Sequence, residues 1–446
     1  MEILRDCLPA SARRTLKELP ESLDETYERI LKEIKKPNRA LAQRVLQCLV
    51  VAIRPLRVAE LAEVLTVDFG DPEGIPRPNA DWRWEDQEQA LLIACSSLIV
   101  IVGTGDSRVV QFSHFSVKEF LTSSRLSTAS GEVSAYRIDL ENAHTILAQA
   151  CLGVLLQAHE IDGNTSENHP LAEYAAKHWN THAQFGEVSS RSQKGMEYLF
   201  NPDKPHFRVW LTLFDIDIKP DQRATFFMFT SYEKCAATPL YYAALCGFHD
   251  LVEHLIAKYP QDVNANGGYY MRPLIAALAG EHFQTADLLH RNGADPHVHG
   301  YRKTMPLHSA ANFEKFGVVQ KLIEYDADID ARDRNGWTPL GWASGGHHFK
   351  DGSVLRLLLE RGADVNARAD DGFTPLHRAS EYGALEVVRL LLEHGADVEA
   401  VGVDGKTALQ VVGAFLLVDD QGQCDEIRRL LVEHGATSKR LQVVVF

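Results

Sequence analysis

Two segments of this 446-residue chain have residue types that ligand chemistry would need. Residues 402–407 end in Gly-Lys-Thr like a phosphate-binding loop, but that loop requires a first glycine where this chain has Ala400. His347 and His348, with Asp351, could supply metal ligands. Adjacent histidines point apart on most backbones and no further ligand stands at a typical spacing, so a polar insertion explains them better. The sequence therefore predicts no metal site and no cofactor site.

His308 and His377 are the remaining candidates for acid–base chemistry. Both stand in a recurring Pro-Leu-His step, where a histidine is expected to make local hydrogen bonds. The sequence contains neither a Gly-x-Ser-x-Gly elbow nor a His-Glu-x-x-His motif. We therefore predict that the chain is not an enzyme and has no small-molecule substrate.

A repeat of about 33 residues organises the C-terminal half. Thr-Pro-Leu or a variant recurs, and from Pro239 the aligned positions lie 34, 33, 33, 36 and 33 residues apart. Gly-Ala-Asp or a variant follows each apolar stretch, as at residues 395–397. The motifs begin at Thr238, Arg272, Met305, Thr338, Thr374 and Thr407. About six units are predicted, more than the three or so that a stable stack needs.

The repeat resembles the ankyrin family, most clearly in residues 371–377, Asp-Gly-Phe-Thr-Pro-Leu-His. Proline suits the first helical turn because its missing N–H would be unpaired there, and the preceding threonine is a good N-cap. Glycine ends the second helix in a left-handed conformation. The resemblance implies an α-solenoid with β-hairpin fingers that binds proteins. Ala408 replaces the proline in the sixth unit, as expected of a degenerate terminal cap.

Aromatic residues on the expected fingers are the candidate binding residues. Trp337 and Phe373 directly precede Thr-Pro-Leu, where ankyrin arrays point a side chain toward their concave face. Aromatic anchors are enriched at binding hot spots, and the alternative is packing between adjacent fingers. The predicted protein-binding residues are Tyr269, Tyr270, Arg334, Trp337, Phe373, Glu381, Tyr382 and Lys406. Residues 231–446 hold 29 Asp and Glu against 21 Lys and Arg, which favours a basic partner.

The N-terminal half predicts helices and one hairpin. Helical spacing of apolar residues indicates helices over residues 39–53, 58–65 and 85–95. Apolar runs at 98–102 and 108–112 flank Thr-Gly-Asp-Ser, which indicates a hairpin. A capping box at residues 116–119 is expected to open another helix. This order outlines a winged helix, and helical patterns after residue 139 predict a helical connector.

Motifs in this half resemble fungal NACHT–ankyrin proteins, which are similar to NOD-like receptors. Residues 19–31, Leu-Pro-Glu-Ser-Leu-Asp-Glu-Thr-Tyr-Glu-Arg-Ile-Leu, resemble the stretch that follows their NACHT domain. Residues 114–121, His-Phe-Ser-Val-Lys-Glu-Phe-Leu, resemble their winged-helix domain of the GPI inositol-deacylase type. The resemblance implies a nucleotide-driven switch, with a NACHT NTPase domain before residue 19. Only 18 residues precede it here, so we expect a C-terminal portion or a protein without its NTPase, and no NTP hydrolysis.

Composition and charge bear on whether the chain binds nucleic acid, crosses a membrane or works in a reducing compartment. The chain is 45% hydrophobic and 24% charged, as globular proteins are, and its formal charge of −15 disfavours nucleic acid as a partner. Residues 84–89 in the third helix of the winged helix are acidic, which disfavours DNA there too. No apolar run approaches the roughly 20 residues of a membrane helix, and no signal peptide is recognised. Seven cysteines without a Cys-x-x-Cys pair favour the reducing cytoplasm or nucleus.

The predicted organisation has four parts. They are a helical segment following a NACHT domain (1–37), a winged helix (38–130), a helical connector (131–230) and ankyrin repeats (231–446). The predicted fold is mostly α. The predicted function is a non-enzymatic scaffold or sensor that binds a protein on the concave face of the array, in NOD-like receptor signalling or non-self recognition. The alternatives are a DNA-binding regulator acting through the winged helix and a fragment of a larger NTPase-driven switch.

Overall fold

The computed structural model describes residues 23–70, 75–128, 131–157, 169–217, 237–297, 305–345, 352–414 and 421–437. The chain divides into two compact units, Met1–Asp215 and Ile216–Phe446. The finer division into four parts stays a prediction. Residues 19–22 and the predicted insertion at His347, His348 and Asp351 lie outside the described ranges. Within those ranges, no helix is long and apolar enough to cross a membrane.

The first unit begins with helices that pack around one apolar core. They are α3 (Leu23–Glu33), α4 (Arg39–Val51), α5 (Val58–Leu65) and α6 (Gln87–Cys95). Val45, Leu61 and Leu91 have no exposed surface. Each such side chain contributes about 1.5–3 kcal/mol when it leaves water, so their helical spacing brings these helices together.

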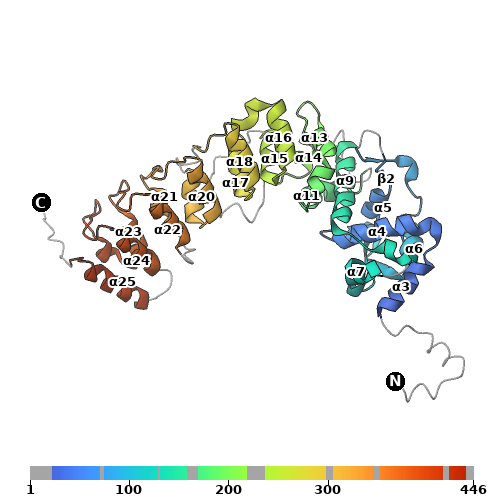
Figure 1. The fold of residues 1–446 in the computed structure, drawn as a ribbon, viewed down its shortest axis with the longest axis horizontal. Helices are drawn as coiled ribbons and strands as arrows, with labels where there is room; N and C mark the ends of the chain where they lie inside the picture. The colour runs from blue at the N-terminus through green and yellow to red at the C-terminus, as the bar shows by residue number, and fades with distance from the viewer. Residues whose placement is uncertain are drawn as a thin grey trace, which may run out of the picture. The chain divides into compact units, whose positions relative to one another are not determined.

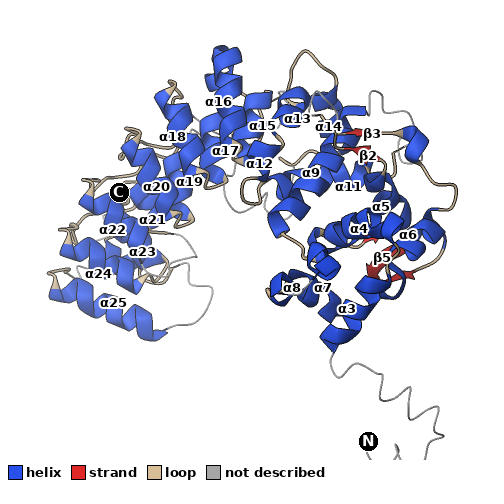
Figure 2. Ribbon diagram, turned by 45° about the vertical axis from the view of Figure 1, so that its right-hand side comes forward, coloured by secondary structure: helices blue, strands red, loops and turns tan. Residues whose placement is uncertain are grey.

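A small antiparallel sheet completes the winged-helix outline. Strands β4 (Ile99–Val102) and β5 (Val109–Phe112) form the predicted hairpin, with Ile99 opposite Phe112. Strand β1 (Leu56–Arg57) pairs with the other edge of β5. The sheet therefore joins the hairpin to a strand from an earlier part of the chain. Figure 2 shows the strands in red, with β5 labelled.

The predicted capping box at residues 116–119 is wrong. Helix α7 spans Phe115–Thr122, and its N-cap is His114, two residues before Ser116. The Nδ1 atom of His114 accepts a hydrogen bond from the Ser116 backbone N–H at 3.3 Å, so an imidazole does what a serine was expected to do. The Ser116 hydroxyl instead lies 2.7 Å from the hydroxyl of Tyr27.

Longer helices follow in the first unit. They include α9 (Leu140–Gln157), α11 (Ala172–Ala183) and α14 (His206–Leu213), close to the predicted helical patterns. Trp179 and Trp210 pack edge to face with ring centroids 5.4 Å apart, and Trp210 Nε1 donates to the Ala176 carbonyl at 2.9 Å. Shorter elements of this unit are β2 (Val67–Asp68), β3 (Arg77–Pro78), α8 (Arg125–Thr128), α12 (Val188–Arg191) and α13 (Gln193–Leu199).

The second unit is a stack of helix pairs in chain order (Figure 1). Its first helices are α15 (Pro239–Cys246), α17 (Pro273–Ala279), α19 (Pro306–Asn312), α21 (Pro339–Ala343) and α23 (Pro375–Glu381). Its second helices are α16 (His249–Lys258), α18 (Phe283–Arg291), α20 (Phe316–Glu324), α22 (Ser353–Glu360), α24 (Leu385–Glu393) and α25 (Gln421–Glu433). Neighbouring first helices contact each other, as α15 and α17 do, and neighbouring second helices contact each other, as α22 and α24 do. This produces two layers (Figure 2).

The repeat motif begins and ends these helices as expected. The Thr338 hydroxyl accepts the Gly341 N–H at 3.3 Å, with proline at the first helical position. Gly395 takes a left-handed φ of 83° after α24, and in the third repeat Asp326 takes this conformation with φ 60°. In the sixth unit, Ala408 opens only a 3₁₀ helix, η8 (Ala408–Val411).

Candidate protein-interaction site on the ankyrin array

Asp333 organises the fourth finger. Its Oδ1 accepts the backbone N–H groups of Asn335 at 2.9 Å and Trp337 at 2.8 Å, and its Oδ2 accepts Trp342 Nε1 at 3.1 Å. The Asp333 N–H donates back to the Trp337 carbonyl at 2.9 Å, which closes the turn. A carboxylate that is 8% exposed thus fixes the backbone of one tryptophan and the ring of another.

Arg378, from the fifth repeat, stacks on these two tryptophans. Its Cζ lies 4.6 Å from the ring centroid of Trp337 and 5.8 Å from that of Trp342. An added Cβ on Gly341 would collide with the Trp337 ring, and one on Gly345 would collide with the Arg378 side chain. The two glycines therefore make room for a cation–π stack that joins two repeats.

Phe373, on the fifth finger, packs against its own repeat and the next. Its ring stacks on that of His377 with centroids 4.8 Å apart, and it lies against Gly402 of the sixth finger. It nevertheless keeps part of its surface exposed, as Trp337 does. Packing between fingers, the alternative to binding, accounts for the buried part of both side chains.

The two repeat histidines have structural hydrogen bonds. His377 Nδ1 accepts the Thr374 N–H at 3.2 Å, and its Nε2 lies 3.2 Å from the Lys406 carbonyl in the next finger. His308 Nε2 likewise lies 3.0 Å from the Trp337 carbonyl. Burial lowers the pKa of both imidazoles, which favours the neutral ring that these bonds use.

Glu381 and Tyr382 lie at the end of α23, one helical turn beyond Arg378. Both side chains are half-buried. Burial raises the pKa of Glu381 to about 7, and the nearby Arg378 only partly opposes this. Lys406 is exposed and pairs with Asp404 at 3.0 Å, while Arg334 is exposed on the fourth finger.

Tyr269 and Tyr270 belong to a different part of the array. The Tyr269 N–H donates to Asp217 at 2.5 Å, and the Tyr270 N–H donates to the Tyr241 hydroxyl at 3.1 Å. Burial raises the pKa of the Tyr270 phenol to about 12. These bonds tie the second finger to the first repeat, and the structure does not bring the two tyrosines together with Trp337 or Phe373.

Arg378, Trp342 and Asp333 were missed by the sequence prediction. Arg378 follows the histidine of the motif, where nothing marks one residue as more important than another. A signal was available in Gly341, because glycine inside a helix costs about 1 kcal/mol and so indicates close packing there. Asp333 also stands three residues before Gly336, and an aspartate shortly before Asn-Gly indicates a turn held by its side chain.

Family models match the chain in both units. Ankyrin-repeat models match residues 235–265 and, in three overlapping copies, residues 273–369, 307–402 and 348–440. A model for the winged helix domain of GPI inositol-deacylase matches residues 27–132. The chain carries a winged-helix domain of this type and an ankyrin array. These matches confirm the predicted fold class, and an ankyrin array supports a role as a protein-interaction scaffold.

Similar proteins share parts of this arrangement. Azaphilone pigments biosynthesis cluster protein L of Monascus ruber is 30% identical over 298 residues, 63% of this chain and 61% of that protein. Ankyrin repeat and SOCS box protein 5 of Mus musculus is 33% identical over 112 residues, 25% of this chain and 33% of that protein. The crystal structure of the ankyrin repeat domain of Bcl-3 is 28% identical, covers 46% of this chain and 88% of that chain, and has a TM-score of 0.40. The chain thus spans less than two thirds of both curated relatives.

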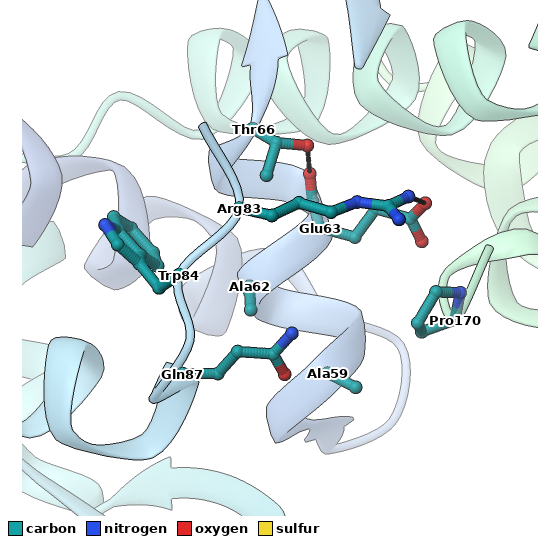
Figure 3. Close-up of a pocket in the computed structure, with 8 residues that line it drawn as sticks. All are labelled: Ala59, Ala62, Glu63, Thr66, Arg83, Trp84, Gln87 and Pro170. Carbon is teal, nitrogen blue, oxygen red and sulfur yellow. Dashed lines mark hydrogen bonds and ion pairs between the residues drawn. The ribbon is translucent and has the colours of Figure 1, made fainter. Parts of the chain in front are cut away.

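The winged-helix unit contains a cavity of about 70 Å³ beside α5 (Figure 3). Buried Glu63 accepts the Leu171 N–H at 2.6 Å and lies 3.7 Å from Arg83 and 3.4 Å from His169. The Thr66 hydroxyl donates to the Glu63 carbonyl at 2.8 Å, so it is not presented as a nucleophile. These contacts tie α5 to the residues before α11, which is a structural role. Among the described residues, no three His, Cys, Asp or Glu side chains gather as metal ligands would.

Proposed function

We propose that the ankyrin array binds a protein ligand through its fourth to sixth fingers and helices α21 and α23. The stack of Trp337, Arg378 and Trp342 carries this proposal, because it is preorganised by Asp333 and keeps part of its aromatic surface exposed. Rigid aromatic and arginine side chains lose little freedom on binding, and they dominate hot spots at protein interfaces.

The other predicted residues would surround this centre. Phe373, Glu381 and Tyr382 lie on the adjoining fifth repeat, and Arg334 and Lys406 lie on the flanking fingers. In this proposal they form the rim, where truncation costs less than at the centre. Tyr269 and Tyr270 would take part only with a ligand long enough to reach the second finger.

We also propose that this binding is the sensing step of a NOD-like receptor type of protein, without catalysis by this chain. The winged-helix match supports that setting, and the presence of a phosphate-binding loop in the full-length transcript would test it. The cytoplasm or nucleus is the proposed compartment, because the five cysteines that the structure describes are buried and form no disulfide. DNA is not a proposed partner, because α6 carries no Lys or Arg that could contact phosphates. The nearby Arg108 is already paired with Glu88 of α6.

Affinity capture tests the binding site. The full chain serves as bait in a lysate of the source organism, beside the variant W337A/F373A. Loss of a central anchor costs about 2 kcal/mol, or about thirtyfold in Kd, so the captured protein should disappear from the variant. F316A is the matched control, because Phe316 is 44% exposed but lies on second helix α20. Equal capture by all three baits would contradict the proposed site.

A further inference from the structure

Arg378 is a largely buried cation that has no acidic partner in the part of the array that the structure describes. Elsewhere in the array, Arg272 pairs with Asp295 at 2.7 Å and Arg389 pairs with Glu426 at 2.8 Å. Among the described residues, no carboxylate forms an ion pair with Arg378, and its Nε is buried without a hydrogen-bond acceptor. Burial lowers the pKa of this guanidinium. A charge buried without a partner destabilises a fold, and a partner molecule could supply what is missing.

We propose that Arg378 is the anchor of the protein-binding site and takes the carboxylate of an aspartate or glutamate side chain of the partner. The inference rests on the proposed function, because it concerns the same fingers and helix. Trp337 and Trp342 keep the guanidinium in a fixed orientation. Nε points into the protein, while the two terminal nitrogens are not buried. A carboxylate can accept hydrogen bonds from both of them at once.

The described carboxylates whose charges act on Arg378 do not fill this role. Both oxygens of Asp333 already accept hydrogen bonds, from two backbone N–H groups and the Trp342 indole. Asp371 accepts the Phe373 N–H at 2.9 Å within its own finger. Glu381 has a pKa raised to about 7, so its negative charge is only partly present near neutral pH. The cation therefore stays available to an external acid.

The surrounding charge selects a carboxylate over a phosphate. Asp371 and Glu381 raise the pKa of the guanidinium, which shows that their charge reaches the site. They would repel a phosphate, which carries about −1.5 to −2, more strongly than a carboxylate with −1. The array as a whole holds 29 acidic against 21 basic residues. The fitting partner is therefore a basic protein segment that carries one aspartate or glutamate.

Peptide selection on the full chain tests this chemistry. A displayed library of random 12-residue peptides is selected on the wild-type protein, and the best binders are resynthesised with their acidic residue changed to its amide. We expect selected peptides to contain one Asp or Glu flanked by Lys or Arg, and the amide to weaken binding at least tenfold. This comparison needs no protein variant, so it does not depend on how R378Q folds.

Protein variants locate the contact. R378Q should bind the parent peptide at least tenfold more weakly, and acid and amide peptides should then bind it equally. R378K keeps the positive charge but cannot donate two parallel hydrogen bonds to one carboxylate, so it should recover only part of the affinity. R356Q, which changes an exposed arginine of α22, is the matched control and should bind like the wild type. Selected peptides without acidic residues, or an acid preference that survives in R378Q, would overturn the inference. The proposed function would still hold in that case if the wild-type bait captured a protein that the W337A/F373A bait did not.

Discussion

Replacing Asp333 by alanine should open the fourth finger and release both tryptophans of the stack. The side chain accepts three hydrogen bonds at 2.8 to 3.1 Å, and it is 8% exposed. A hydrogen bond to a charged group contributes about 1.5–3 kcal/mol, and three bonds to one carboxylate are not additive. We therefore expect D333A to lower the free energy of local opening by about 3 kcal/mol, or roughly a hundredfold in the opening equilibrium.

Hydrogen exchange on the full chain measures this opening directly. Peptides covering residues 331–345 should exchange about a hundredfold faster in D333A, whereas peptides of α15 should not change, because distant repeats contribute separately to stability. D371A is the matched control. Asp371 is an exposed aspartate in the next finger, and its side chain accepts a hydrogen bond from the Phe373 N–H at 2.9 Å. If residues 331–345 exchanged within a few-fold of the same rate in D333A and D371A, Asp333 would not be what holds the fourth finger closed.

Two further predictions concern buried charge in the first unit. Burial lowers the pKa of His182 in the folded state from 6.5 to about 3. As the pH falls below 6.5, this imidazole is therefore protonated in the unfolded chain but not in the folded one, and the free energy of unfolding decreases. Urea unfolding should give a free energy of unfolding about 1.4 kcal/mol lower at pH 5.5 than at pH 7.5. If H182N lost the same amount between these pH values, His182 would not be the cause. E60A should lower the free energy of unfolding by about 3 kcal/mol in the same assay, because it leaves Arg54 without its carboxylate partner. Arg54 donates to both Glu60 oxygens, at 2.7 and 2.6 Å. The control E173A removes an exposed carboxylate and should cost under about 1 kcal/mol; similar losses in the two variants would contradict the difference in burial.

The repeat period was enough to predict the array. Proline and threonine at fixed positions decide where each first helix begins, and this information is local to the sequence. Helix α5 was predicted with its observed bounds, Val58–Leu65, because Pro55-Leu56-Arg57 breaks the helical pattern that precedes it. The N-cap of α7 was predicted two residues too late, since nothing in the local pattern favours His114 over Ser116 as the cap.

The stack could not be predicted in the same way. Trp337 and Arg378 are 41 positions apart and come from different repeats, so their contact depends on how the repeats stack. Periodicity places both residues near the fingers, but it does not say which side chain covers which. For the same reason, Glu381 could be named as a candidate from its position, while its raised pKa follows only from burial in the assembled array.

The polar groups near the fingers differ in whether the array satisfies them. His308, His377 and Asp333 have hydrogen-bond partners in their own or the next repeat, so the stacked array satisfies them without a ligand. Arg378 has aromatic neighbours but no acceptor among the described residues. A group that only served stacking could be replaced by an apolar side chain of similar size at little cost. A binding site, in contrast, must leave some of its hydrogen-bonding capacity unused until the partner arrives. In the described part of these fingers, the Ser380 and Thr407 hydroxyls are also buried without a partner, but Arg378 is the group among the three that carries a charge.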